Sequence, residues 1–286
     1  LHQMRLLISS FLLFLSVSAD FDDSLARNFF LPLSSAAYSD SPQQCMDKRM
    51  EGAKLSIRVE VPCDDIATDT CSAFTMVDST RQRIALVFRG TQGDEQLDLE
   101  IYTTLNDEKV PFRDGGEVVP YFRQAFDLIT GHSLGGALAA LGAVHVAKNN
   151  LFNTEKYASF HLINQTTPNV FTENNVFCRI VYYTFGEPRT GDKTFANLLD
   201  SLQNHFRVVH DHDMIPHCPF LSMHYQHHAT EVWYANDMSP GSPYKVCVGQ
   251  EDSTCSSSNQ FNLNFDPDHP HYYGIHVPTY GRSGCT

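Results

Sequence analysis

The stretch that decides the fold is LITGHSLGGALAAL, residues 128–141, in which one serine lies between glycines just ahead of an alanine-rich helical pattern. Gly131-His132-Ser133-Leu134-Gly135 matches G-x-S-x-G, a sharp strand-to-helix turn that admits only small residues two positions on either side of the serine. The helix that follows would direct its free N–H groups and positive dipole end at the serine oxygen, which suits an oxyanion. The stretch therefore predicts a nucleophilic serine, Ser133.

Strands and helices alternate on both sides of this turn. Strand-like runs occupy residues 54–61, 73–78, 83–90, 178–186 and 206–210, and helical patterns occupy residues 136–148 and 192–203. Several of these runs are almost continuously apolar, as strands buried on both faces are. The pattern predicts an α/β fold with a mixed, mostly parallel sheet flanked by helices, the early strands being antiparallel. No repeat or linker marks a boundary, so residues 20–286 are expected to form a single domain.

Charge and the amino-terminal residues bear on the partners and location of the protein. The formal net charge is -13, which disfavours nucleic acids and anionic bilayers as partners. Residues 4–19 read as a secretory signal, with Arg5 ahead of an apolar run and small residues before Asp20. The apolar run is about a dozen residues, short of the roughly 20 that span a bilayer. We therefore expect residues 1–19 to be leader and cleaved signal, and a secreted protein without a transmembrane anchor.

Eight cysteines in a secreted chain predict disulfides, although 105 connectivities are open. The closely spaced pairs Cys63/Cys71 and Cys247/Cys255 are candidates for small local loops. Asn164 begins the one N-glycosylation sequon.

A serine nucleophile needs a base, and the base needs an acid to hold its tautomer. In the α/β-hydrolase order, both partners lie downstream of the serine. Asp211 and Asp213 follow the strand at residues 206–210, where a parallel sheet delivers catalytic groups. His269, His271 and His276 lie near the carboxyl terminus. Residue composition leaves the choice among them open.

Several motifs, in order, resemble those of the fungal-type (class 3) lipases, in a version similar to secreted nematode members. They are VFRGT, GHSLGGALA, YTFGEPRTGDKTFA, RVVHDHDMIPHCP, HHATEVWY and HPHYYG, between residues 87 and 274. The resemblance implies an α/β-hydrolase fold and hydrolysis of acylglycerol or other carboxylic esters, at a lipid–water interface in some members, without a cofactor. Feruloyl esterases, which act on soluble esters, belong to the same family.

The resemblance also implies a role for individual residues. Asp213, directly before Met214-Ile215-Pro216, matches the catalytic aspartate. His269 matches the catalytic histidine, with His271 in reserve. Thr91 and the N–H of Leu134 match the two oxyanion-hole donors.

Two further stretches have competing interpretations. The His-rich stretch 210–228 invites a metal site, but the motifs above account for its residues and no helical H-x-x-x-H pair occurs, so no metal is expected. Residues 92–110 occupy the place of the family's lid, and Leu97, Leu99 and Ile101 alternate there with polar residues. This alternation suits an amphipathic flap or an acidic, solvent-facing loop.

One departure from the family concerns the segment before the nucleophile. Only residues 127–130 separate Phe126, in the preceding helical stretch, from Gly131. Roughly twenty residues of helix end and strand are missing relative to what a βα unit requires. We therefore predict a fold that lacks one helix end and one strand here, with a cost in stability, and an inactive lipase-like protein as the alternative to an active enzyme.

Overall fold

The computed structural model describes residues 20–62, 69–81, 83–93, 96, 102–104, 106, 108–123, 133–149, 181–202, 204–258 and 268–286. The predicted signal, residues 1–19, lies outside this part of the chain. So do Cys63, the glycosylation candidate Asn164, and Gly131 and His132 of the predicted nucleophile turn.

The first sheet contains three antiparallel strands. They are β1 (Ala53–Pro62), β2 (Thr70–Asp78) and β3 (Arg83–Phe88), in spatial order β1-β2-β3. Each matches a run that the sequence predicts as a strand, and the antiparallel pairing of the early strands is confirmed.

The second sheet contains four strands in the order β6-β7-β8-β9. The strands β6 (Tyr182–Phe185), β7 (His205–His210) and β8 (Glu231–Tyr234) are parallel, and β9 (Lys245–Cys247) is an antiparallel edge strand. Every residue of β6 and β7 is buried, as expected of parallel strands that are covered on both faces. The predicted α/β class with a mixed sheet is therefore confirmed.

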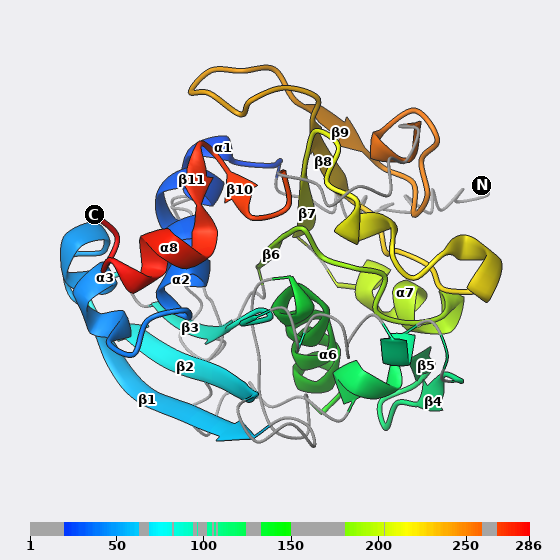
Figure 1. Cartoon of the computed structure of the whole chain (residues 1–286), viewed down its shortest axis with the longest axis horizontal. Helices are drawn as coiled ribbons and strands as arrows, with labels where there is room; N and C mark the ends of the chain where they lie inside the picture. Colours follow the sequence, from blue (N-terminus) through cyan, green and yellow to red (C-terminus); the bar gives the residue numbers. More distant parts are fainter. Residues whose placement is uncertain are drawn as a thin grey trace, which may run out of the picture.

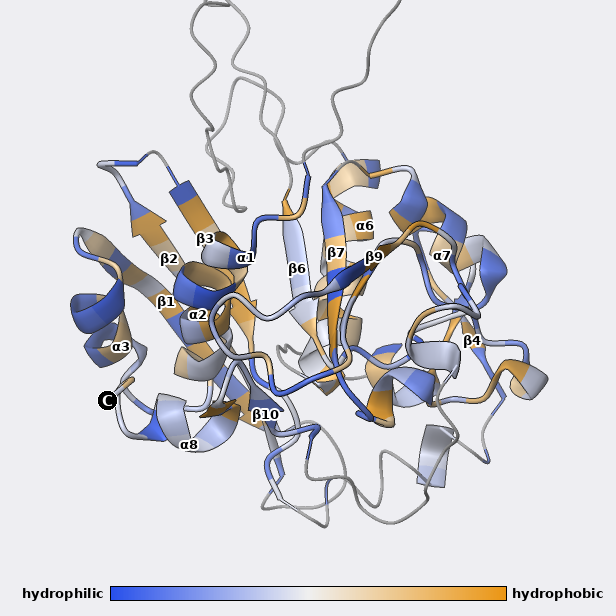
Figure 2. Cartoon of the chain, turned by 90° about the horizontal axis from the view of Figure 1, so that it is seen from above, coloured by the Kyte–Doolittle hydropathy of each residue, from blue (hydrophilic) through white to orange (hydrophobic). Residues whose placement is uncertain are grey.

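Helices cover both faces of the strands (Figures 1 and 2). One layer contains α6 (Leu134–Lys148) and α7 (Lys193–Asp200). The other layer is built from the two ends of the described chain: α1 (Asp23–Leu25), η1 (Ala26–Phe30), α2 (Leu31–Ala36), α3 (Pro42–Arg49) and α8 (Val277–Arg282). Successive side chains of a strand point to opposite faces of the sheet. In β6, Tyr182 accordingly packs on the α6 side, and Phe185 packs on the side of the terminal helices.

Short elements complete the described chain. They are β4 (Val110–Pro111), β5 (Glu117–Val118), η2 (Ile215–His217), η3 (Leu221–Met223), η4 (Ser256–Ser258), β10 (His271–Tyr272) and β11 (Ile275–His276). The described part of the chain includes no helix with the length and apolar character to cross a membrane.

The two larger sheets are separate over the described residues, since β3 and β6 form no strand pair there. Helix α6 packs against both β3 and β6 and so lies across the division. Residues 124–132, which lead into Ser133, are outside the described ranges. The predicted loss of a strand at this point remains a prediction.

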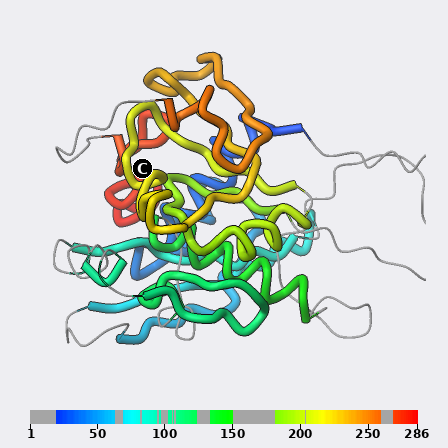
Figure 3. Tube along the Cα trace, turned by 90° about the vertical axis from the view of Figure 1, so that its right-hand side faces the viewer, coloured from blue at the N-terminus to red at the C-terminus, as the bar shows by residue number. Residues whose placement is uncertain are grey.

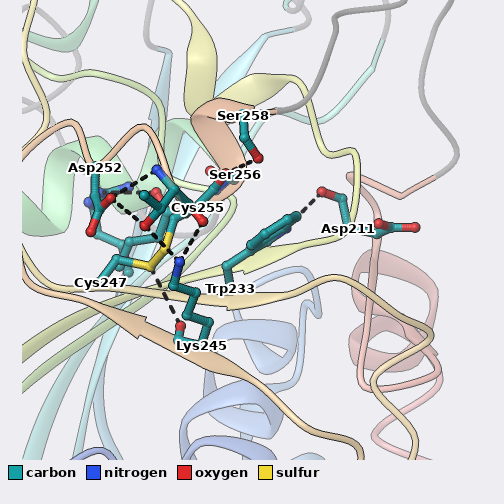
Figure 4. Close-up of a disulfide and its surroundings, with 11 residues drawn as sticks. Asp211, Trp233, Lys245, Cys247, Asp252, Cys255, Ser256 and Ser258 are labelled. Atoms are coloured by element: carbon teal, nitrogen blue, oxygen red, sulfur yellow. Dashed lines mark hydrogen bonds and ion pairs between the residues drawn. A yellow bond between two sulfur atoms is a disulfide. The ribbon is translucent and has the colours of Figure 1, made fainter.

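Two disulfides are present among the described residues. Cys45 in α3 pairs with Cys285 beyond α8, so the terminal segments are joined covalently where they lie side by side (Figure 3). Cys247 of β9 pairs with Cys255, as the sequence suggests (Figure 4). The proposed Cys63/Cys71 pair involves a residue outside the described ranges.

Candidate active site

Ser133 lies at the amino end of α6 in a strained backbone conformation. Its φ of 62° and ψ of -112° are unusual for a residue other than glycine, as expected of a nucleophile turn. Its neighbour Gly135 allows the close packing of this turn. A Cβ on Gly135 would lie 2.8 Å from the carbonyl oxygen of Arg89.

His269 bridges Ser133 and Asp213. Its Nε2 lies 2.8 Å from Ser133 Oγ, and its Nδ1 lies 3.0 Å from each carboxylate oxygen of Asp213. These contacts place a base against the hydroxyl and an acid against the base. The structure thus brings together three residues that lie 80 and 56 positions apart in the chain.

Asp213 is fully buried, yet its surroundings favour the carboxylate. Burial raises its pKa, but the His269 ring, the hydroxyl of Tyr272 and the N–H of Ile215 outweigh that effect, so the pKa is lowered overall. Tyr272 donates to Oδ2 at 2.6 Å and Ile215 donates to Oδ1 at 3.0 Å. The aspartate is therefore ionised at neutral pH and can stabilise an imidazolium.

Contacts between backbone and side-chain atoms hold the loop that carries His269 against the end of β7. Asp268 accepts a hydrogen bond from the N–H of His212 at 3.3 Å, and its carbonyl oxygen lies 3.4 Å from His210 Nδ1. These contacts fix the residue next to His269 beside the loop that carries Asp213.

Gly186, directly after β6, provides the space in which the His–Asp pair lies. Its φ is +62°, and a Cβ there would lie 2.8 Å from Asp213 Oδ2 and 2.9 Å from His269 Nδ1. A side chain at this position would displace the pair. Glycine meets both the steric and the conformational requirement.

The predicted oxyanion donors lie at the start of α6 and after β3. Leu134 is the first residue of α6, where N–H groups lack helical partners. Thr91 follows β3 by three residues, and the Arg89 backbone just before it packs on Gly135 in the first turn of α6. The chain leading to Thr91 therefore runs close to the nucleophile turn.

The other sequence candidates lie elsewhere. The ring of His271 faces His276 across the β10–β11 hairpin, with centroids 4.9 Å apart. Asp211 pairs with His212 at 3.1 Å, and its carbonyl oxygen accepts the indole N–H of Trp233 (Figure 4). Of these candidates, His269 lies against Ser133, and Asp213 lies against His269.

The predicted lid region is only partly described. Residues 96, 102–104 and 106 are helical, whereas Leu97, Leu99 and Ile101 lie outside the described ranges. Gln96 is buried, accepts the N–H of Gln92 at 2.7 Å and donates to the hydroxyl of Tyr121 at 3.2 Å. The segment after Thr91 is thus anchored to the residues before α6.

Sequence reasoning missed two residues of this site. Tyr272 and Gly186 were visible only as parts of motifs, and nothing in their spacing indicates contact with Asp213. A buried tyrosine next to a catalytic motif and a glycine directly after a buried strand are the signals that could have drawn attention to them.

Known proteins resemble the chain in sequence. A family model described as lipase (class 3) matches residues 127–223. A lipase of Caenorhabditis elegans is 32% identical over 320 residues, which cover 93% of this chain and 83% of that protein. That alignment is longer than the 286 residues of this chain, so the relative has residues without a counterpart here. The secreted mono- and diacylglycerol lipase 1 of Fusarium solani is 29% identical over 136 residues, which cover 45% of this chain and only 32% of that protein.

Solved structures resemble the chain in fold. The Rhizomucor miehei triacylglyceride lipase matches with a TM-score of 0.65 at 22% identity, over 94% of this chain and 99% of that chain. Its fold, an α/β-hydrolase fold, is the one expected from the sequence.

Proposed function

The chain belongs to the class 3 lipase family and is a carboxylic ester hydrolase; from this premise we propose that it cleaves the esters of acylglycerols through Ser133, His269 and Asp213. The observation that carries the proposal is the continuous chain of contacts from Ser133 Oγ through the His269 ring to the Asp213 carboxylate. The mono- and diacylglycerol lipase of Fusarium solani supports the choice of acylglycerols.

The chemistry is acyl transfer in two halves. His269 Nε2 accepts the Ser133 proton as Oγ attacks the ester carbonyl carbon, and Asp213 stabilises the imidazolium that forms. The N–H of Leu134 and the N–H and hydroxyl of Thr91 stabilise the tetrahedral oxyanion. The intermediate then collapses, and His269 protonates the alcohol that leaves. Water, deprotonated by His269, releases the acid from the acyl-enzyme in the second half.

We also propose that residues 20–286 act as one secreted domain. The two disulfides support an oxidising compartment, since such bonds persist there and are rare in the cytosol. The secreted Fusarium solani relative is consistent with this location.

The test is hydrolysis of short-chain and long-chain p-nitrophenyl esters. Ser133→Ala is expected to lower kcat by at least about 10³-fold, because the nucleophile is removed. Ser283→Ala is the matched control, since Ser283 lies in the G-R-S-G sequence after α8, outside the site, and should retain full turnover. Equal activity in Ser133→Ala and the unaltered chain would contradict the proposal. The ratio of long-chain to short-chain rates separates a lipase from a feruloyl-type esterase acting on soluble esters.

A second candidate is a lipase-like protein that binds an ester without turning it over. The short connection of residues 127–130 before Gly131 favours it, because a shortened helix and strand would disturb the nucleophile turn. Its signature would be a folded chain with no turnover of any of these esters.

A further inference from the structure

The turn that follows the catalytic histidine loop contains a strained residue, Tyr273. It lies between β10 and β11, is buried and has a φ of 56°. A non-glycine residue in this conformation costs free energy, so its surroundings must hold it there. The preceding residue, Tyr272, donates to the Asp213 carboxylate, and His269 lies two residues before β10. A movement of this turn would therefore reach the His269–Asp213 pair directly.

Arg27, from the other end of the described chain, contacts this turn. Its guanidinium carbon lies over the Tyr273 ring, 4.0 Å from the centroid, in a cation–π contact. Figure 1 shows the first helix beside the β10–β11 hairpin. Nη1 of Arg27 donates at 2.6 Å to the carbonyl oxygen of Met238, which lies between β8 and β9. The N–H of Tyr273 donates to the Met238 sulfur at 3.5 Å. One side chain thus joins two loops that also contact each other.

The Arg27 guanidinium is itself held in a fixed direction. Asp23, four residues earlier, accepts from Nε at 3.3 Å through one carboxylate oxygen and from Nη2 at 3.0 Å through the other. Such paired contacts restrict the orientation of the guanidinium. The hydroxyl of Tyr234 donates to the same carboxylate. The Arg27 side chain is only 13% exposed, so solvent screens these contacts little. Arg27 also lies in η1, a π-helix, and π-helical turns are rare and frequent at functional sites.

The Tyr273 ring also contacts the strand end that borders the catalytic pair. It packs edge-on against Phe185, with the ring centroids 6.1 Å apart. Phe185 is the last residue of β6 and directly precedes Gly186, where a Cβ would collide with His269 and Asp213. The ring that Arg27 covers is therefore part of the packing around the His–Asp pair.

We propose that Arg27 is a positioning residue of the active site. By holding the Tyr273 turn, it keeps the His269 imidazole aligned between Ser133 and Asp213. It acts through Tyr273 and not on the ester itself. This role rests on the function proposed above, and it makes ester hydrolysis depend on a segment more than a hundred residues before the nucleophile in the sequence.

The first test measures hydrolysis of p-nitrophenyl butyrate by the full mature chain and by Arg27→Met. We expect kcat to fall by at least about 10-fold, since a misplacement of about 1 Å costs about 100-fold. KM should change by less than about twofold, because the contacts with the ester remain. Arg27→Lys keeps the charge over the ring but lacks the planar fork, so its kcat should lie between the two.

Arg81→Met is the matched control. Arg81 likewise donates to a main-chain carbonyl oxygen, that of Glu51 at 2.8 Å, and pairs with the Asp78 carboxylate at 3.1 Å. It joins the β2–β3 turn to the loop before β1, and it should keep full turnover when removed. All rates are compared at a temperature at which circular dichroism shows each variant to be folded. A general loss of stability would then leave kcat unchanged.

A second readout does not depend on turnover. Hydrogen exchange followed by mass spectrometry reports local opening of the peptide that covers residues 268–276. Exchange in this peptide should accelerate by at least about 10-fold in Arg27→Met and stay unchanged in Arg81→Met. If Arg27→Met does not fold, Arg27→Lys decides both measurements, with smaller changes in the same direction.

The two readouts separate failure of this proposal from failure of the proposed function. If the unaltered chain hydrolyses the ester and Ser133→Ala does not, equal kcat values in Arg27→Met and Arg81→Met would overturn the role of Arg27 alone. If the unaltered chain turns over no ester, the proposed function fails, and hydrogen exchange then decides whether Arg27 holds the hairpin. Equal exchange of residues 268–276 in the two arginine variants would overturn the proposal in either case.

Discussion

Gly186 shows how a single missing side chain can shape a catalytic site. The His–Asp pair lies where a Cβ on this residue would be, and the left-handed backbone adds conformational strain to any substitution. We expect Gly186→Ala to lower kcat/KM by at least about 100-fold, because displacing the base by about 1 Å is enough for a loss of that size. Gly241→Ala is the matched control: Gly241 also has positive φ, at 85°, but its Cβ would meet no atom of the described residues within 4 Å. Comparable losses of activity in both variants would show that backbone strain, not crowding of the pair, is responsible.

Tyr272 donates one hydrogen bond to Asp213, the aspartate of the proposed triad. In Tyr272→Phe the carboxylate loses a donor, so the pKa of Asp213 should rise and the acid limb of the pH–kcat/KM profile should move to higher pH. A hydrogen bond to a charged group contributes about 1.5–3 kcal/mol, which corresponds to roughly 10- to 150-fold in rate if all of it acts in the transition state. Tyr273→Phe, which changes the neighbouring ring that packs on Arg27, should leave the acid limb in place. An unmoved acid limb in Tyr272→Phe would refute the positioning role.

At the residue scale the sequence indicated the three residues that the structure brings together, Ser133, Asp213 and His269, better than it indicated their surroundings. The G-x-S-x-G pattern identifies Ser133 from local backbone requirements alone, whereas the choice of Asp213 and His269 needed the family resemblance. Contacts such as that between Tyr272 and Asp213 depend on how separate loops meet above the sheet. No local pattern encodes that meeting.

The η2 segment after Asp213 carries a pH-sensitive residue, His217. Burial and the nearby charge of Arg189 lower its pKa from 6.5 to about 4. The unfolded chain therefore takes up a proton on this residue between pH 6.5 and 4, and the folded chain does not. Stability should accordingly be complete above pH 6.5 and fall as the pH drops through this window, by about 3 kcal/mol from His217. Burial lowers the pKa of His227 too, which acts in the same direction.

Urea unfolding at pH 7, 5.5 and 4.5 measures this effect. The midpoint should decrease at each step, and His217→Gln should show a smaller decrease. An identical pH dependence in His217→Gln would place the effect on other groups.

At the element scale, prediction succeeded where a pattern is long and periodic. The ranges for β1, β2, β3 and α6 match the observed bounds within a few residues, because alternating or apolar strand runs and an alanine-rich helical run are distinct patterns. The helices between residues 23 and 49 were not predicted. Short helices of this kind depend on packing rather than on propensity, and here they pack on the sheet beside α8.

The two larger sheets of the described residues share their hydrophobic layers. The core beneath the terminal helices includes Phe74 and Val87 of the first sheet and Phe185 and Val208 of the second, while α6 packs on both. We therefore expect a single cooperative transition when the mature chain is melted and followed by circular dichroism. The shared layers favour one cooperative unit, whereas the predicted loss of a strand before Ser133 would lower the stability of the fold. Two separated transitions would show that the sheets unfold independently, and no transition would show that the lost segment prevents folding.

The disulfide between Cys45 and Cys285 has a topological consequence. The residues it joins are 240 positions apart, so it closes most of the described chain into a covalent ring. A protease that cuts once at any point between them opens the ring without releasing a fragment. The nicked molecule keeps the mass of the intact chain, apart from one added water, until a reductant separates its two pieces. On a gel, a single cut between these cysteines therefore yields separate fragments only after reduction.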